Sequence, residues 1–235
     1  MKTAAALFDV DGTLLDTAYL HALSWWEALR QYDRTVPAAR VHRAVGMGAD
    51  QLLDHLLGEH RDHGDDQAIT AAHDALYASH WPVIAPLPGA PELLRACAAR
   101  GWRIVLASSA SERELAVLRR ALGADDVIAA ATSADDVAAT KPAPDLVHAA
   151  LDRAGADPAD AVFVGDTVWD VVAAARARVP CVAVESGGFA AQELLGCGAA
   201  EVHRDTAELL AELDGSLLAR VPEERSPGAA GPRAA

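Results

Sequence analysis

Residues 7–17 read LFDVDGTLLDT, an apolar run that leads into two carboxylates. Asp9 and Asp11 are one residue apart, so in a β-strand they lie on one face, with Phe8 and Val10 on the other. Neighbouring carboxylates raise each other's pKa, so one can keep a proton near neutral pH while a metal keeps the other ionised. That division is typical of an acid or base beside a nucleophile. The stretch therefore predicts a buried first strand whose end carries chemistry.

Apolar runs of strand length recur along the rest of the chain, separated by segments of helical periodicity. The strand-like runs cover residues 4–10, 102–107, 126–130, 161–166 and 179–184. The helical segments between them cover residues 90–100, 111–122, 143–154 and 168–178, and Gly101, Gly123 and Gly155 mark helix ends. Such alternation predicts an α/β fold, a Rossmann-like parallel sheet with helices on both faces. Ligands of such sheets bind beyond the carboxyl ends of the strands.

The segment between the first two strand-like runs breaks this alternation. Its helical periods cover residues 18–32, 37–45, 49–57 and 66–80, and a proline-rich return follows from Trp81. These features predict a small all-helical cap inserted after the first strand. We assign residues 1–15 and 86–220 to the core, 16–85 to the cap with its hinge linkers, and 221–235 to a loose tail. The histidine-rich stretch 55–66 is assigned to the surface rather than to a metal site.

The composition limits the classes of partner. The 235 residues carry a formal net charge of −14, which disfavours a nucleic-acid surface because such surfaces need clustered Lys and Arg. Cys97, Cys181 and Cys197 lack CxxC spacing, which disfavours a disulfide framework or a zinc site and is typical of a reducing cytosol. The N-terminal apolar run is cut by Asp9, so neither a signal peptide nor a membrane span is predicted. We expect a cytoplasmic monomer or small homo-oligomer without membrane partners.

Small polar residues follow the first two strands. Gly12 allows close backbone approach, and Thr13 adds a hydroxyl next to the Asp pair. Ser108 and Ser109 end the second strand just before a helix, where free N–H groups and the helix dipole favour an anion. Ser111 is placed to cap that helix. A phosphate group would fit this position.

Two further strand ends carry charge. Lys141 precedes two prolines in ATKPAPD, and we expect its ammonium to reach across the mouth of a pocket. Asp166 ends the fourth strand-like run, and Asp170 follows four residues later. If a helix starts near Thr167, both carboxylates face one end of the sheet and form an oxygen-rich site suited to Mg²⁺. Taken singly, Asp166 could instead cap the helix and Asp170 could interact with its dipole.

The ordered set FDVDGT, LASS, TKPAPD and VGDTVWD resembles the four motifs of the haloacid dehalogenase superfamily. By that resemblance Asp9 would be the nucleophile that forms an aspartyl-phosphate, and Asp11 would protonate the leaving alcohol and later activate water. Ser108 would bind the phosphoryl oxygens, and Lys141 would offset their charge. The resemblance also implies that Mg²⁺ would be held by Asp9, the carbonyl of Asp11 and Asp166, with Asp170 in support.

The same resemblance narrows the reaction. Members that cleave carbon–halogen bonds lack the second Asp, so Asp11 favours phosphate esters. We expect a Mg²⁺-dependent phosphomonoesterase acting on a small phosphorylated metabolite, such as a sugar phosphate or phosphoglycolate. A β-phosphoglucomutase-like mutase is the alternative because His21 matches a hinge-side His of that enzyme. However, Ala49 and Ser111 stand where the mutase carries cations for a second phosphate.

Two other classes remain open. A phosphoryl-accepting receiver is disfavoured because the Asp pair lies at the very start of the chain, and a non-catalytic phosphosugar-binding module is disfavoured by the intact acids and Lys141. The residues that we assign to substrate binding are Gly12, Thr13, Ser109, His21 and Arg43. The cap candidates for specificity also include Trp25, His42 and Met47, for which packing roles are the competing interpretation.

Overall fold

The computed structural model describes residues 3–137 and 139–221. The sheet has six parallel strands in the order β3-β2-β1-β4-β5-β6. The strands are β1 Ala5–Phe8, β2 Arg103–Ala107, β3 Ile128–Thr132, β4 Ala161–Gly165, β5 Cys181–Val184 and β6 Glu201–His203. β1 pairs with both β2 and β4, so the first strand lies in the middle of the sheet. Its four residues are fully buried, as the apolar sequence predicts for a strand covered on both faces.

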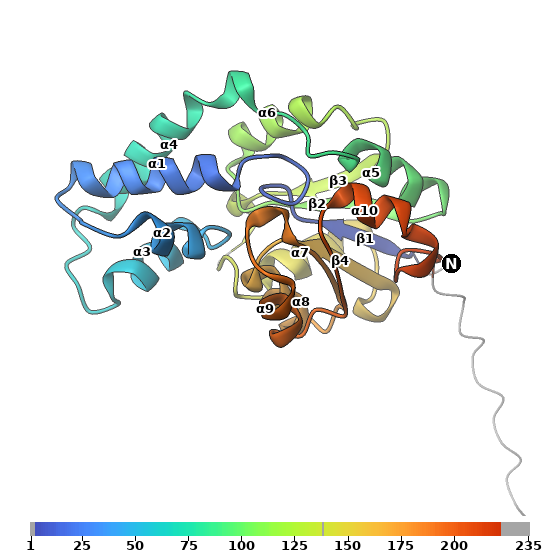
Figure 1. The fold of residues 1–235 in the computed structure, drawn as a ribbon. Coiled ribbons are helices and arrows are strands. Elements are labelled where there is room, and N and C mark those ends of the chain that lie inside the picture. The colour runs from blue at the N-terminus through green and yellow to red at the C-terminus, as the bar shows by residue number, and fades with distance from the viewer. Residues whose placement is uncertain (1–2, 138, 222–235) are drawn as a thin grey trace, which may run out of the picture.

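Helices cover both faces of the sheet (Figure 1). One face packs against α5 Ala90–Ala99, α6 Glu112–Leu122 and α10 Thr206–Ala211, and the other against α7 Asp145–Ala154, α8 Val168–Arg176 and α9 Ala191–Gly196. The alternation of β1 divides its side chains between the two cores: Phe8 lies in the first and Leu7 in the second. The predicted α/β fold with helices on both faces is confirmed.

Four of the helices that follow β1 and precede β2 lie to one side of the sheet (Figure 1). They are α1 Ala18–Gln31, α2 Ala38–Ala44, α3 Ala49–Leu57 and α4 Asp66–Ala78. Apolar residues of all four helices form a hydrophobic cluster separate from the two cores on the sheet. Trp25 and Leu29 of α1 pack there with Leu52 of α3 and Ile69 of α4. The all-helical insertion is confirmed, whereas the boundaries 16–85 for a cap domain stay a prediction.

The structure differs from the sequence expectation at the edges of the sheet. β6 was not predicted, because its three residues include only one apolar side chain. β3 begins two residues later than expected, at Ile128, because this edge strand is only partly buried and its periodicity is weak. The loose tail predicted for 221–235 lies outside the described residues except for its first residue. Among the described residues, no helix is long and apolar enough to cross a membrane.

Candidate active site

The end of β1 sets the position of the Asp pair. The main-chain N–H of Asp9 donates to the carbonyl of Val164 at 2.9 Å, which continues the β1–β4 register past Phe8. The chain then turns at Gly12, whose φ is +82°. A Cβ at this position would lie 2.4 Å from Oδ2 of Asp166. The motif therefore needs glycine both for its backbone conformation and for room beside a carboxylate from the neighbouring strand.

Lys141 is buried between two carboxylates. Its Nζ lies 2.5 Å from Oδ1 of Asp9 and 2.7 Å from Oδ1 of Asp170, and the side chain is only 1% exposed. Burial alone would lower the pKa of Lys141, but Asp170 and Asp9 outweigh it and raise that pKa above its ordinary value. The ammonium is therefore a fixed positive charge inside the site. The sequence predicted that this ammonium reaches across the mouth of a pocket; Lys141 does line the cavity, but it is buried between the two acids.

Asp166 offers an oxygen to which no described group of the protein donates a hydrogen bond. The hydroxyl of Thr13 donates to its Oδ1 at 2.6 Å, while its Oδ2 is buried with no hydrogen-bond partner. Burial, together with the charges of Asp170 and Asp9, raises the pKa of Asp166 well above its ordinary value. Carboxylate oxygens of Asp9, Asp166 and Asp170 lie within 4.8 Å of one another. Three buried acids, one ammonium and an orphaned oxygen fit a divalent cation that prefers oxygen ligands.

Asp170 has a different environment from Asp166. Its Oδ1 accepts from Lys141, and its Oδ2 accepts from both the main-chain N–H (3.0 Å) and the hydroxyl (2.6 Å) of Thr167. Thr167 is the N-cap of α8, and the two residues form a capping box. Both oxygens of Asp170 are therefore occupied by protein donors. The helix cap proves to be Thr167 rather than Asp166.

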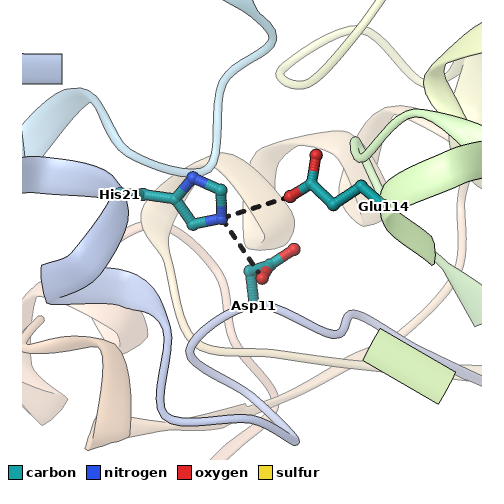
Figure 2. A group of neighbouring side chains, drawn as sticks. All are labelled: Asp11, His21 and Glu114. Atoms are coloured by element: carbon teal, nitrogen blue, oxygen red, sulfur yellow. Dashed lines mark hydrogen bonds and ion pairs between the residues drawn. The ribbon is translucent and has the colours of Figure 1, made fainter. Parts of the chain in front are cut away.

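Asp11 faces a second group of side chains, drawn in Figure 2. Nε2 of His21 lies 3.3 Å from Oδ1 of Asp11 and 3.7 Å from Oε1 of Glu114. The hydroxyl of Thr17 also donates to Oδ1 of Asp11, at 2.7 Å. His21 comes from α1 of the insert and Glu114 from α6 of the core. The surroundings of Asp11 therefore include side chains from both the insert and the core.

A hydrogen-bonded chain continues from His21 into the insert. Nδ1 of His21 lies 3.2 Å from Nε2 of His73, and Nδ1 of His73 lies 3.0 Å from Oδ1 of Asp74. Because a carboxylate only accepts, His73 carries its proton on Nδ1 and its Nε2 accepts from His21. The indole of Trp25 stacks on His73 at 4.0 Å. Burial lowers the pKa of His73 to about 4, so this imidazole is neutral at pH 7.

Asp9 and Asp11 have opposite pKa shifts. Burial raises the pKa of Asp9 to about 7, although Lys141 opposes the rise. Burial would also raise the pKa of Asp11, but the charge and hydrogen bond of His21 bring it below its ordinary value. In the protein without a metal the proton therefore favours Asp9, whereas the resemblance gives it to Asp11 with a metal bound at Asp9. The reason is that Asp9 has two acidic neighbours and one shared ammonium, whereas Asp11 has its own imidazole.

The serines after β2 lie at the start of α6. Ser108 is fully buried and its hydroxyl accepts from the main-chain N–H of Ala110 at 3.1 Å. The hydroxyl of Ser109 is buried without a hydrogen-bond partner among residues 3–137 and 139–221. Ser111 is the N-cap of α6, accepting from the N–H of Glu114 at 3.3 Å. The predicted cap is confirmed, and the helix start presents donors toward the site as an anion requires.

A cavity of about 220 Å³ opens above the acids, between the core and the insert. Of the predicted residues, its lining includes Asp9, Asp11, Ser109, Lys141 and His21. Gly12 and Thr13 are instead packed around Asp166. Trp25 and Met47, candidates from the insert, also line the cavity.

Arg43 lies outside the residues that line this cavity. Its guanidinium pairs with Glu193 of α9 at 2.6 Å and lies 3.7 Å from the centre of the Phe189 ring. Nε2 of His42, next to it, lies 2.8 Å from the carbonyl oxygen of Gly187. The structure therefore places Arg43 at the contact between the insert and the core, because acidic and aromatic partners face it there. Its predicted contact with substrate has no support from this position.

Sequence reasoning missed three titratable side chains of the cavity. Glu114, His73 and Asp74 all line it; Glu114 is an ion-pair partner of His21 and His73 is a hydrogen-bond partner of His21. Glu114 had one visible signal, its place in the first turn of the helix that follows the LASS strand end. His73 and Asp74 had none, because α1 and α4 bring them to the site only by packing together.

A second acidic cluster lies in the histidine-rich stretch of the insert. Asp54, His63 and Asp66 have possible ligand atoms within 4.8 Å of one another. The guanidinium of Arg61 lies 2.9 Å from Asp66 and 3.2 Å from Asp54. That guanidinium already supplies the positive charge of the cluster.

Known proteins resemble the chain across most of its length. The haloacid dehalogenase-like hydrolase family model matches residues 3–178. Phosphoglycolate phosphatase of Rhodospirillum rubrum is 34% identical over 217 residues, which cover 87% of this chain and 88% of that protein. The crystal structure of a hydrolase from Pseudomonas syringae has a TM-score of 0.85 and 32% identity, covering 91% of this chain and 99% of that one. CbbY from Rhodobacter sphaeroides, solved with xylulose-(1,5)bisphosphate, has a TM-score of 0.73 and 26% identity, covering 88% and 96% of the two chains.

These matches and the site geometry agree with the four motifs. The chain belongs to the haloacid dehalogenase-like hydrolases. Within that family it is an enzyme of the phosphatase branch. The resemblance inferred from the motifs is confirmed.

Proposed function

We propose that this enzyme hydrolyses small organic phosphate monoesters with Mg²⁺ through an aspartyl-phosphate on Asp9. The observation that carries the proposal is the separation of two acid environments. Asp9 lies with Asp166 and Lys141 in a buried charged group, while Asp11 lies one residue away beside His21 at the cavity. A nucleophile and a proton carrier need such different surroundings.

In this mechanism the carboxylate of Asp9 attacks phosphorus, and the bond from phosphorus to the ester oxygen breaks. Asp9 would stay ionised with Mg²⁺ held beside it, which leaves the proton to Asp11. Asp11 gives this proton to the leaving alcohol, so the alcohol departs neutral. Asp11 then takes a proton from water, which attacks the phosphorus of the aspartyl-phosphate and releases inorganic phosphate and Asp9. His21 holds the Asp11 carboxyl in reach of the cavity during both steps. Asp11 can act as the acid in the first step and as the base in the second, because the second step returns its proton.

The charge of the transferred group needs compensation. Lys141 supplies one positive charge beside Asp9. Mg²⁺ when bound would offset charge on the phosphoryl oxygens, held by Asp9, Asp166 and the carbonyl of Asp11. The free Oδ2 of Asp166 supports this assignment. Asp170 supports the site by orienting Lys141, because both of its oxygens are engaged.

The phosphate itself would lie at the start of α6. Ser108 ends the strand there, and the hydroxyl of Ser109 is buried without a partner. The main-chain N–H groups at this helix start favour the phosphoryl oxygens. The four helices of the insert, residues 16–85 with their linkers, would act as a lid over the leaving alcohol.

The direct test is Asp9→Asn, assayed for phosphate release from a generic aryl phosphate with Mg²⁺. We expect release to fall to background, because an amide cannot form the aspartyl-phosphate. Asp145→Asn, at the start of α7 outside the site, is the matched control and should keep full activity. Unchanged turnover in a correctly folded Asp9→Asn protein would refute the mechanism.

A phosphosugar mutase is the alternative reaction on the same fold. Ala49 and Ser111 line the cavity, and neither supplies the cation that a second phosphate would need. Hydrolysis is therefore favoured. Incubation with a sugar phosphate and its bisphosphate distinguishes the two, because a mutase interconverts isomers while a phosphatase releases inorganic phosphate.

The cellular context belongs to the same proposal. We place the enzyme in the cytoplasm, acting as a monomer or small homo-oligomer on a small phosphorylated metabolite. The sparse cysteines and the acidic net charge support this placement.

A further inference from the structure

The cavity wall beyond Asp11 faces the leaving alcohol, since Asp9 and the start of α6 hold the phosphoryl group. This wall comes from α1, α3, α4 and the loop before α3 in the insert, and from Glu114 of α6. Trp25, Leu52 and Met47 give it apolar area. At about 220 Å³ the cavity suits a short alcohol rather than a long chain.

The charged groups of the wall are mainly acids. Glu114 and Asp74 line it together with Asp11, and Oε1 of Glu114 is buried with no hydrogen-bond partner. A buried carboxylate oxygen without a donor costs free energy until a donor reaches it. Oε1 of Glu114 therefore receives no hydrogen bond from a described group, and the imidazole of His21, 3.7 Å away, is its ion-pair partner.

The cations of the lining are all engaged. Lys141 is held between Asp9 and Asp170. His21 lies between Asp11 and Glu114, and His73 is a neutral imidazole that accepts from His21. Among the described lining residues there is no other Lys, Arg or His. A carboxylate or second phosphate on the alcohol would find no free partner charge on these side chains.

We propose that the leaving alcohol carries a hydrogen-bond donor, either a hydroxyl or an ammonium group, which binds the free oxygen of Glu114, and that Glu114 rejects alcohols bearing an anion. The inference rests on the proposed phosphatase function and makes Glu114 a specificity-determining residue of that site. A donor completes the wall, whereas an anion meets the charge of Asp74 and of ionised Glu114. Burial raises the pKa of Glu114 to about 7, so this repulsion by Glu114 is strongest above pH 7.

One feature of the wall favours the opposite choice. The start of α3, with Gly48 as its N-cap and Ala49 as its first residue, also lines the cavity, and its N–H groups could hold an anion. Asp50 in the first turn of α3 places a negative charge at that same helix end. The first turn of α6 carries two acids of its own, so charge at the helix end does not decide between the two groups. We favour a donor because Oε1 of Glu114 is buried and receives no hydrogen bond from a described group.

Four two-carbon phosphate esters test the proposal, since they differ only in the group at the far carbon. These are 2-hydroxyethyl phosphate, 2-aminoethyl phosphate, ethyl phosphate and phosphoglycolate. We expect the hydroxyl or ammonium ester to have the highest kcat/KM, with phosphoglycolate below ethyl phosphate. The order of the first two tells whether the donor is a hydroxyl or an ammonium group.

Glu114→Gln then identifies the residue responsible. We expect the preference of the donor-bearing esters over phosphoglycolate to fall about tenfold or more, the usual effect of one charged hydrogen bond. Glu112→Gln is the matched control: it removes the same charge from the first turn of α6 on the exposed side and should leave the ratios unchanged. Glu114→Gln could also lower the activity toward all esters by disturbing His21 and Asp11. Such a common loss cancels because only ratios of kcat/KM between esters are compared.

Three results overturn the inference. Phosphoglycolate as the best of the four esters would show that an anion is accepted and would point to the start of α3. Equal effects of Glu114→Gln on all four esters would give this residue a role in the chemistry rather than in specificity. If none of these esters nor an aryl phosphate releases phosphate, the proposed function itself fails.

Discussion

Nζ of Lys141 lies 2.7 Å from Oδ1 of Asp170, whose other oxygen accepts two hydrogen bonds from Thr167 at the start of α8. The direction of the catalytic ammonium is therefore fixed by a helix cap. Lys141 comes from the loop before α7, and Asp170 from the first turn of α8. A loop cation is thus held in place by a rigid element of the core, as a preorganised site requires.

Asp170→Asn is expected to lower kcat by about 10- to 100-fold with a smaller change in KM. The amide keeps an acceptor for Thr167 but loses the charged hydrogen bond to Lys141, which is worth about 1.5–3 kcal/mol. The measurement is steady-state phosphate release from an aryl phosphate. Asp145→Asn serves as the control. A variant with unchanged kcat would show that Asp9 alone orients Lys141.

Asp166→Asn is expected to raise the melting temperature of the metal-free protein and to abolish its response to Mg²⁺. In the metal-free protein Asp166 is a buried acid that faces two other carboxylates, so a neutral side chain removes repulsion. In the wild type, Mg²⁺ at 100 times its Kd should add about 2.7 kcal/mol to the free energy of unfolding. Thermal melts with EDTA and with Mg²⁺ check both statements. Equal Mg²⁺ stabilisation of wild type and variant would remove Asp166 from the metal site.

His73 should make the protein sensitive to mild acid. Its pKa is about 4 in the folded protein and ordinarily 6.5, so the unfolded chain binds a proton between these values while the folded protein does not. The contribution of His73 to the free energy of unfolding is therefore fully present above pH 6.5. It falls by about 3 kcal/mol in total as the pH falls toward 4.

The check for this effect is His73→Gln, unfolded with urea at several pH values from 7 to 4.5. The difference in free energy of unfolding between wild type and variant should shift in favour of the variant as the pH falls. The exposed His148→Gln is the control and should follow the wild-type curve. A constant difference across this range would mean that the His73 imidazole is protonated in the folded state or reaches water.

The sequence could predict the core of the site because parallel strands end at one edge of the sheet. Asp9 and Asp166 follow the neighbouring strands β1 and β4, so their proximity follows from strand order alone. The roles of their neighbours were harder to predict. Asp170 forms a Thr-x-x-Asp capping box with Thr167, and that local pattern competes with a role as a free metal ligand.

The cavity wall could not be predicted in the same way. Glu114, His73 and Asp74 reach the site through the packing of α1 on α4 and the placement of the insert over α6, and helical periodicity fixes neither. Periodicity shows which face of a helix is apolar but not which partner that face meets. The predictions for the insert were therefore sound for its helices and weakest for its side-chain contacts.

Substitution of Arg43 tests a contact between the insert and the core that the sequence did not predict. Its guanidinium lies against Glu193 and Phe189 of the core, so we expect Arg43→Ala to weaken the closed position of the insert. The pair is exposed, and the salt bridge and the cation–π contact together are worth about 1 kcal/mol. KM should therefore rise by a similar small factor for every phosphate ester, and high salt should reduce the difference from wild type.

The matched control is Arg40→Ala, an exposed arginine of the same helix. KM values for the four two-carbon esters, measured at low and high salt, distinguish the two roles of Arg43. A guanidinium that holds the insert on the core acts before the alcohol is recognised, so its loss affects all four esters alike. A rise in KM confined to phosphoglycolate would instead mean that Arg43 turns into the cavity and binds the anionic end of that substrate, as the sequence suggested.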